Sequence, residues 1–125
     1  SHREIDQIGI AAATRLAMQR GLESLSIQPQ FLILDAFPLP EVQIPQKPII
    51  RGDSSCLSIA AASVVAKVTR DCYMEGQDVL YPRYGFAKNK GYPTQDHLKN
   101  LRTFGPSPIH RMSFAPVANW RDTSQ

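Results

Sequence analysis

The chain has 125 residues, 42% of them hydrophobic, and a formal net charge of +3 at neutral pH. This length fits one domain with a core large enough to fold without disulfides or a structural metal. The mild positive charge is compatible with a polyanionic partner, and no apolar run approaches the roughly 20 residues of a membrane-spanning helix. We therefore expect one soluble domain over residues 1–125.

Apolar residues recur at a spacing of about 3.6 through residues 4–25, which predicts a helix. The apolar run at residues 31–34 then predicts a short strand that is buried on both faces. Asp35 ends this strand, at the position where open α/β sheets usually place ligand chemistry. A carboxylate that only caps or ion-pairs with the following loop is the alternative. Prolines exclude a central strand over residues 36–48, leaving a loop with room for one short edge strand.

The segment from Arg51 to Asp71 opens with a Gly-Asp-Ser turn and continues with small and apolar residues. It predicts a buried helix from about Ser54 to Leu80. Asp53 stands where the loop becomes helix. Asp53 or Ser54 is a natural N-cap, and a carboxylate presented to a working site is the other interpretation of Asp53.

Two cysteines, Cys56 and Cys72, fall within this expected helix. A helix would separate them by about 24 Å, whereas disulfide-linked Cα atoms lie within about 7 Å of each other. We therefore expect two free thiols. Together with the lack of a signal peptide, they favour a cytoplasmic protein.

Residues 81–94 interleave aromatic side chains with cations and two glycines, and we expect no regular structure there. Aromatic rings can stack on bases or sugars while Lys and Arg neutralise phosphates. Inward packing of the aromatics is the alternative. A helix over Gln95 to Phe104, capped by Thr94, should follow, and the tail from Gly105 should be irregular.

The acids Asp35 and Asp53 are the strongest candidates for chemistry. Carboxylate oxygens bind hard cations such as Mg²⁺, and two such ions can support phosphodiester cleavage. The histidines show no ligand spacing, so zinc is not expected. The Arg-Gly-Asp tripeptide at 51–53 matches an adhesion motif, but we expect no adhesion role, because we expect neither a secretory signal nor a disulfide.

Several segments match one known family in order and spacing: Ile33-Leu34-Asp35-Ala36, Ile50-Arg51-Gly52-Asp53-Ser54, the helix from Ser58 to Asp71, Tyr84-Gly85-Phe86, Lys90-Gly91-Tyr92-Pro93-Thr94 and His110-Arg111-Met112-Ser113-Phe114. Through these segments the sequence resembles ribonuclease HII over residues 4–117. The resemblance implies a ribonuclease H-like α/β fold, partial here, with helices packed on a few strands. It also implies endonucleolytic cleavage of the RNA strand of RNA–DNA hybrids and of single ribonucleotides in DNA duplexes.

The resemblance further implies Mg²⁺ or Mn²⁺ held by four carboxylates, two of which correspond to Asp35 and Asp53. Tyr92 matches the family tyrosine that packs near the ribose at the RNA–DNA junction. Arg51 stands where a lysine is common, and it keeps the charge but not the geometry. Four further cations are expected to contact the phosphate backbone, which positions a duplex rather than reading its sequence: Lys67, Arg70, Lys88 and Lys90.

Nothing in the chain matches the Asp-Glu-Ala-Gly-Arg-Gly-like segment that carries the family's other two carboxylates. We therefore expect the C-terminal half or more of such an enzyme, inactive or nearly so by itself, whose partner is the missing N-terminal half of the same protein. The strand at 31–34 should then keep an unpaired edge and an uncovered apolar face. A non-catalytic nucleic-acid-binding module is the main alternative, and a purely interacting subunit is the third.

Overall fold

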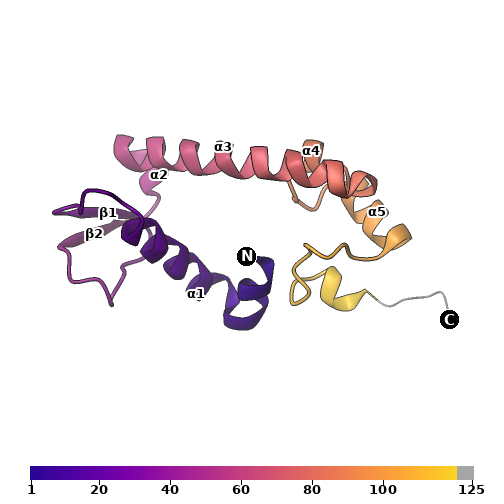
Figure 1. Cartoon of the computed structure of the whole chain (residues 1–125), viewed down its shortest axis with the longest axis horizontal. Helices are drawn as coiled ribbons and strands as arrows, with labels where there is room; N and C mark the ends of the chain where they lie inside the picture. Colours follow the sequence, from indigo (N-terminus) through magenta and orange to yellow (C-terminus); the bar gives the residue numbers. More distant parts are fainter. Residues whose placement is uncertain (121–125) are drawn as a thin grey trace. The chain divides into compact units, whose positions relative to one another are not determined.

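The computed structural model describes residues 1–120. Figure 1 labels the elements along the chain, which are, in order, α1 (His2–Glu23), β1 (Leu32–Asp35), β2 (Gln46–Ile49), α2 (Gly52–Ser55), α3 (Leu57–Leu80), the 3₁₀ turn η1 (Pro82–Tyr84), α4 (Phe86–Asn89), α5 (Gln95–Phe104) and the 3₁₀ turn η2 (Val117–Asn119). The described residues are thus mostly helical with a small parallel sheet. This content is consistent with the expected partial ribonuclease H-like fold.

The chain forms two compact parts. We call Ile8–Ala66 the sheet part, and Ser1–Gln7 with Lys67–Gln125 the Tyr92 part. Helix α1 is interrupted at Gly9, near the start of the sheet part, where a φ of 79° and a ψ of 162° are not helical. The expected single domain over residues 1–125 stays a prediction.

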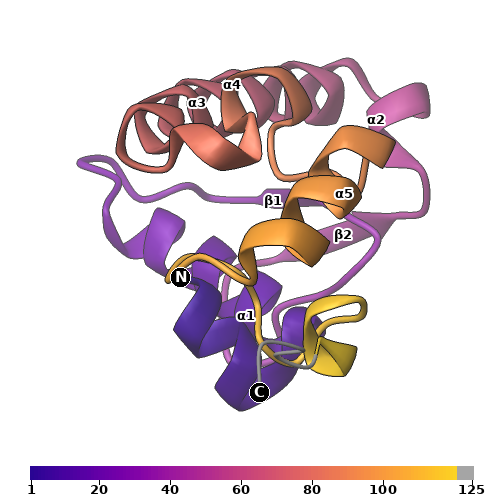
Figure 2. The ribbon, with the colours of Figure 1, turned by 90° about the vertical axis from the view of Figure 1, so that its right-hand side faces the viewer.

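The sheet part contains β1 and β2, which pair in parallel so that Leu32 lies opposite Gln46 and Asp35 opposite Ile49 (Figure 2). Leu32 is buried, but Ile33 is 44% exposed. The pattern of a strand buried on both faces therefore does not hold in this chain, whereas the uncovered apolar face expected without the N-terminal strands is found. Strand β2 is the short edge strand that the prolines left room for, and Pro48 is accommodated within it.

The single helix expected from Ser54 to Leu80 is in fact two helices. Helix α2 ends at Ser55, and Cys56 has extended backbone angles (φ −132°, ψ 117°) before α3 begins at Leu57. Both cysteines are free, and Cys56 lies between the helices rather than within one. The prediction of a buried helix is also wrong, since Ile59 and Met74 are buried whereas Val64 and its neighbours along α3 are exposed.

The N-cap prediction for Asp53 or Ser54 is wrong as well. The residue that precedes α2 is Arg51, which has left-handed backbone angles, and Asp53 lies inside the first helical turn. This placement removes capping as the explanation for the Asp53 carboxylate.

The core of the Tyr92 part forms around Met74, Tyr84 and Phe86. The Tyr84 and Phe86 rings are stacked with centroids 5.5 Å apart, and the buried Tyr84 hydroxyl donates to the Gly105 carbonyl over 2.8 Å. These aromatics pack inward, as the alternative interpretation of residues 81–94 proposed. Because η1 and α4 form in this segment, the prediction that it lacks regular structure is wrong.

The helix over Gln95–Phe104 is confirmed as α5, and Thr94 caps it by accepting the His97 backbone N–H over 3.3 Å. The tail after Gly105 is irregular apart from turns and η2, and its residues 121–125 lie outside the described residues. Within residues 1–120, no helix has the length and hydrophobicity needed to cross a membrane.

Candidate functional site

The first candidate group surrounds Asp35 in the sheet part. Its Oδ1 accepts the backbone N–H of Gly52 over 3.0 Å. The bond joins the C-terminal end of β1 to the turn that opens α2. It therefore places the Asp35 carboxylate against the residue that directly precedes Asp53.

Close packing explains why glycine occupies position 52. A Cβ atom built there would lie 2.3 Å from Ile59 Cδ1 and 3.4 Å from Asp35 Oδ1. Ile59 is itself buried at the start of α3. Gly52 therefore lets the backbone approach both the core and the first acid.

The turn before Asp53 is held by serine hydroxyls. Ser54 Oγ and Ser55 Oγ donate to the Arg51 carbonyl over 2.9 and 3.0 Å. Arg51 adopts φ 54°, a left-handed conformation that is uncommon for a residue with a side chain. Its side chain is exposed, which leaves the cation accessible.

The donor chemistry of these acids suits a hard divalent cation, because Mg²⁺ and Mn²⁺ prefer oxygen ligands. Asp35 uses Oδ1 for the Gly52 bond, which leaves Oδ2 to bind a cation. Among residues 1–120, however, no group of three or more His, Cys, Asp or Glu side chains is placed to hold a metal ion. The described acids fit part of a metal site and not a complete one.

The second candidate group surrounds Tyr92 in the Tyr92 part. The guanidinium carbon of Arg70 lies 4.7 Å from the centroid of the Tyr92 ring, which is a cation–π contact. Arg70 also donates to the Lys90 carbonyl over 2.9 Å. The Tyr92 side chain is 57% exposed, so Arg70 supports a ring that remains available to a partner.

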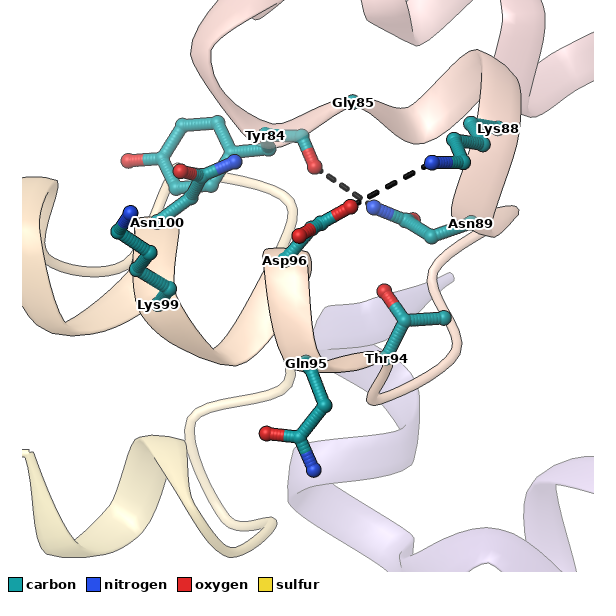
Figure 3. A pocket seen from close by; sticks show the side chains of 9 residues that line it. All are labelled: Tyr84, Gly85, Lys88, Asn89, Thr94, Gln95, Asp96, Lys99 and Asn100. Carbon is teal, nitrogen blue, oxygen red and sulfur yellow. Dashed lines mark hydrogen bonds and ion pairs between the residues drawn. The ribbon is translucent and has the colours of Figure 1, made fainter.

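The backbone before Tyr92 is fixed by Asn89, whose side chain donates to the Tyr84 carbonyl over 2.6 Å (Figure 3). Asn89 Oδ1 accepts the Gly91 N–H over 2.8 Å, and its carbonyl accepts the Tyr92 N–H over 2.8 Å. Gly91 has a φ of 81°, in the region that favours glycine. An adjoining pocket of about 420 Å³ includes Lys88 and Lys99 in its lining. Figure 3 shows these side chains.

The lysines that the sequence assigned to phosphate contacts each have an acidic neighbour. Those ion pairs are Lys67 with Asp71, Lys88 with Asp96, and Lys90 with Glu75. The hydrogen bond to Asp71 raises the pKa of Lys67, and the same bond lowers the pKa of Asp71. A phosphate that contacts one of these lysines would have to compete with its carboxylate. Arg70 differs, because its contacts above are with the Tyr92 ring and the Lys90 carbonyl.

The structure thus forms two groups from the predicted residues. The sheet part brings Asp35 to the turn that contains Arg51 and Asp53. The Tyr92 part brings Tyr92 together with Arg70 and Lys90.

Sequence reasoning missed two contacts in the Tyr92 part. His97 Nε2 and His110 Nε2 lie 3.1 Å apart, although the spacing of these residues suggested no joint role. Asp6 accepts three hydrogen bonds from Met112 and Ser113. The sequence did carry one indication of these contacts, because His110, Met112 and Ser113 all belong to the family motif at residues 110–114.

Comparison with known proteins identifies the family. The family model described as Ribonuclease HII matches residues 1–117. Curated relatives named Ribonuclease HII include that of Desulfitobacterium hafniense, 58% identical over 95% of this chain and 46% of the relative. Those of Lachnoclostridium phytofermentans and Myxococcus xanthus are 54% and 56% identical over 91% of this chain and 45% and 39% of their own lengths. The chain therefore spans about half the length of the curated relatives it matches.

Proposed function

Because this chain belongs to the ribonuclease HII family, we propose that it forms part of a metal-dependent endoribonuclease. The proposed substrates are the RNA strand of RNA–DNA hybrids and single ribonucleotides in DNA duplexes. The observation that carries the proposal is the bond from the Gly52 N–H to Asp35, which joins the strand-end acid to the turn of Asp53. The family match covers both acids.

In this proposal Asp35 and Asp53 are ligands of Mg²⁺ or Mn²⁺. The bound cation would activate water and stabilise the leaving oxygen during cleavage at the phosphate 5′ to a ribonucleotide, giving 3′-hydroxyl and 5′-phosphate ends. The role of Gly52 is to orient Asp35 through its N–H. A metal-ligating side chain whose rotamer is already fixed by a hydrogen bond to the protein loses less conformational entropy when the metal binds.

Tyr92 would pack against the ribose at the RNA–DNA junction, with Arg70 fixing its ring from the other side. The other cations proposed to contact phosphates are Arg51, Lys67, Lys88 and Lys90. The three lysines are paired at the surface with Asp71, Asp96 and Glu75. Because an exposed ion pair is worth about 1 kcal/mol or less, a phosphate can replace the carboxylate at small cost.

We also propose that this chain alone is inactive or nearly so, and that the rest of the enzyme supplies the other metal ligands. The described residues contain no metal-ligand group of three, which supports this view. A cytoplasmic location is also proposed, from the free thiols.

The test measures cleavage of a DNA duplex that contains one ribonucleotide. It compares this chain with a chimaera in which the D. hafniense relative supplies the length that the chain does not cover. The chimaera should cleave and the chain should not. Asp53→Asn or Asp35→Asn in the chimaera should reduce cleavage at least about 100-fold, because a lost ligand removes transition-state stabilisation. The matched control is Glu41→Gln, which changes an exposed carboxylate elsewhere in the sheet part.

Full activity of the Asp53→Asn chimaera would contradict the ligand assignment. A non-catalytic nucleic-acid-binding module is the second candidate, and it is favoured by a supported, exposed Tyr92 in a chain whose described residues hold no complete metal site. Binding of the duplex without cleavage by any form would favour the module.

A further inference from the structure

Two imidazole rings lie directly behind the segment that carries Tyr92. His97 Nδ1 is 2.8 Å from the Tyr92 carbonyl oxygen, and His97 Nε2 is 3.1 Å from His110 Nε2. At the far end, His110 Nδ1 lies 2.9 Å from the Ser107 backbone nitrogen and 2.7 Å from Ser107 Oγ. The contacts form one continuous series of hydrogen bonds from Ser107 to Tyr92.

The partners at the two ends fix where the protons lie. A carbonyl oxygen can only accept, so His97 must carry its proton on Nδ1. A backbone N–H can only donate, so His110 Nδ1 must accept and its proton must lie on Nε2. Between the rings, the His110 Nε2–H then donates to the bare Nε2 of His97. The two neutral tautomers are complementary, and every ring nitrogen has a partner.

A proton added to either ring would interrupt this series of hydrogen bonds. On His97 it would face the His110 Nε2–H across 3.1 Å, and on His110 it would face the Ser107 N–H. Aromatic rings surround the two imidazoles, since Phe86 contacts both of them and Tyr84 contacts His110. The imidazoles line a cavity of about 620 Å³, and Arg70 and Arg111 line it too. Among the described residues, no carboxylate side chain lines this cavity to stabilise an imidazolium.

We infer that His97 and His110 form a neutral, two-ring hydrogen-bond relay that holds the Tyr92 carbonyl and so acts as a positioning device for the Tyr92 ring. The Tyr92 carbonyl also accepts the Thr94 N–H over 2.8 Å, so the relay ties this turn to the core from a second direction. His97 is only 6% exposed and therefore cannot touch a duplex itself. Its link to nucleic-acid binding rests on the proposed function of Tyr92.

The first test needs no substrate. Long-range ¹H–¹⁵N spectra of the ¹⁵N-labelled protein distinguish a protonated from a bare ring nitrogen. The relay requires His97 to be protonated on Nδ1 and His110 on Nε2, with both rings neutral at pH 7. A proton on Nε2 of His97, or an imidazolium at either position, would overturn the inference.

The second test compares two variants of one residue. In His97→Asn the amide nitrogen can replace Nδ1 and keep the bond to Tyr92, whereas in His97→Gln the longer side chain reaches toward His110 and leaves the carbonyl without its donor. We expect His97→Gln to weaken binding of the ribonucleotide-containing duplex by about 5- to 10-fold, and His97→Asn by about 2-fold or less, the difference being one hydrogen bond. The amide resonances of Tyr92 and Thr94 should move further in His97→Gln. Equal shifts in both variants would contradict the relay.

Failure of the proposed function gives a different pattern. If Tyr92→Ala binds the duplex as tightly as the unmodified protein, Tyr92 is not a nucleic-acid contact. The tautomers and the resonance shifts would still report whether the relay holds the Tyr92 turn. Should His97→Gln not fold, the tautomer measurement on the unmodified protein decides the inference.

Discussion

Gly52 occupies a position in which a methyl group would collide with the core. The atom that would be struck is Ile59 Cδ1, 2.3 Å from the point that an added Cβ would occupy, and Asp35 Oδ1 lies 3.4 Å from the same point. Since the backbone of Gly52 also donates to Asp35, steric demand and hydrogen bonding act on the same residue. The placement of Asp35 beside the turn of Asp53 therefore depends on Gly52, a residue that has no side chain.

We predict that Gly52→Ala destabilises the protein by about 1–3 kcal/mol, the usual cost of overpacking a core. Chemical denaturation would measure the free energy of unfolding. Adding Ile59→Val removes Cδ1 and should restore part of the loss, although Ile59 Cγ2 remains 3.2 Å from the new methyl group. A double variant that is less stable than Gly52→Ala alone would refute this steric account.

His110 gives a prediction for pH. Burial, together with the nearby His97, lowers the pKa of His110 from 6.5 to about 4. Because the folded pKa lies below the unfolded one, the stability that depends on neutral His110 is present above about pH 6.5 and is lost as the pH falls from 6.5 toward 4.

Denaturation midpoints measured across this pH range should therefore fall for the unmodified protein. In His110→Asn the fall should be smaller, because the titrating ring is gone while Asn Oδ1 can still accept from Ser107. Parallel pH profiles for the two proteins would show that His110 is not the group responsible.

At the scale of elements, the start of α1 and the segment after α5 are joined by one carboxylate. Asp6 Oδ2 accepts the Met112 N–H over 2.8 Å, and Oδ1 accepts the Ser113 N–H over 2.9 Å and the Ser113 hydroxyl. The hydrogen bond from the Ser113 side chain is the largest cause of the lowered pKa of Asp6. Residues more than 100 positions apart in the sequence are thus connected within the Tyr92 part.

We predict that Asp6→Ala speeds hydrogen exchange at the Met112 and Ser113 amides by about 10-fold, as expected for the loss of about one charge-assisted bond each. Ser113→Ala keeps both amide donors and should leave the exchange of Met112 nearly unchanged. Since the folded pKa of Asp6 is lowered, the protection should be present above about pH 4 and lost as the pH falls through the folded pKa. Unchanged exchange in Asp6→Ala would rule out this anchor.

At the scale of the whole molecule, the sheet part exposes apolar side chains that a packed protein would cover. Leu57 and Val64 are 86% and 61% exposed and lie seven residues apart on α3, hence on one helical face. Within residues 1–120, β1 pairs with β2 alone, so its other edge is not paired by any described strand. Such surfaces are typical of interaction sites and of aggregation-prone proteins.

We predict that the isolated chain self-associates as its concentration rises, because this face has no cover among the described residues. Sedimentation velocity would show the association. The double variant Leu57→Gln with Val64→Gln should shift the association to about 10-fold higher concentration. The control Ile27→Gln changes a residue that is equally exposed but lies in a loop, and it should have little effect. A chain that stays monomeric at all concentrations would contradict the prediction.

Local signals predicted several features correctly. Thr94 caps α5 because a side-chain oxygen placed before a helix satisfies a free N–H of its own first turn. Asp35 ends β1 because the apolar run ends there. The family motifs were also recognised from sequence, since they are contiguous and ordered along the chain, and the family is confirmed.

The features that sequence did not predict depend on contacts across the chain. The break at Cys56 arises where the backbone must turn from the Asp35-bound Gly52 into the buried Ile59, and neither constraint is local. The degree to which Ile33 is exposed depends on what packs on that face of β1, and periodicity cannot report it. The His97–His110 relay joins residues 13 positions apart through geometry alone.

The sequence by itself thus determined the family and the order of the main elements, because each is written in adjacent residues. Asp35 and Asp53 remain the acids that it predicts for the site. Only the tertiary structure decided how Asp35 is oriented, what supports Tyr92 and how far each apolar side chain is exposed. These depend on distances between residues that are far apart in the chain, and on groups such as Gly52 whose role is to leave space.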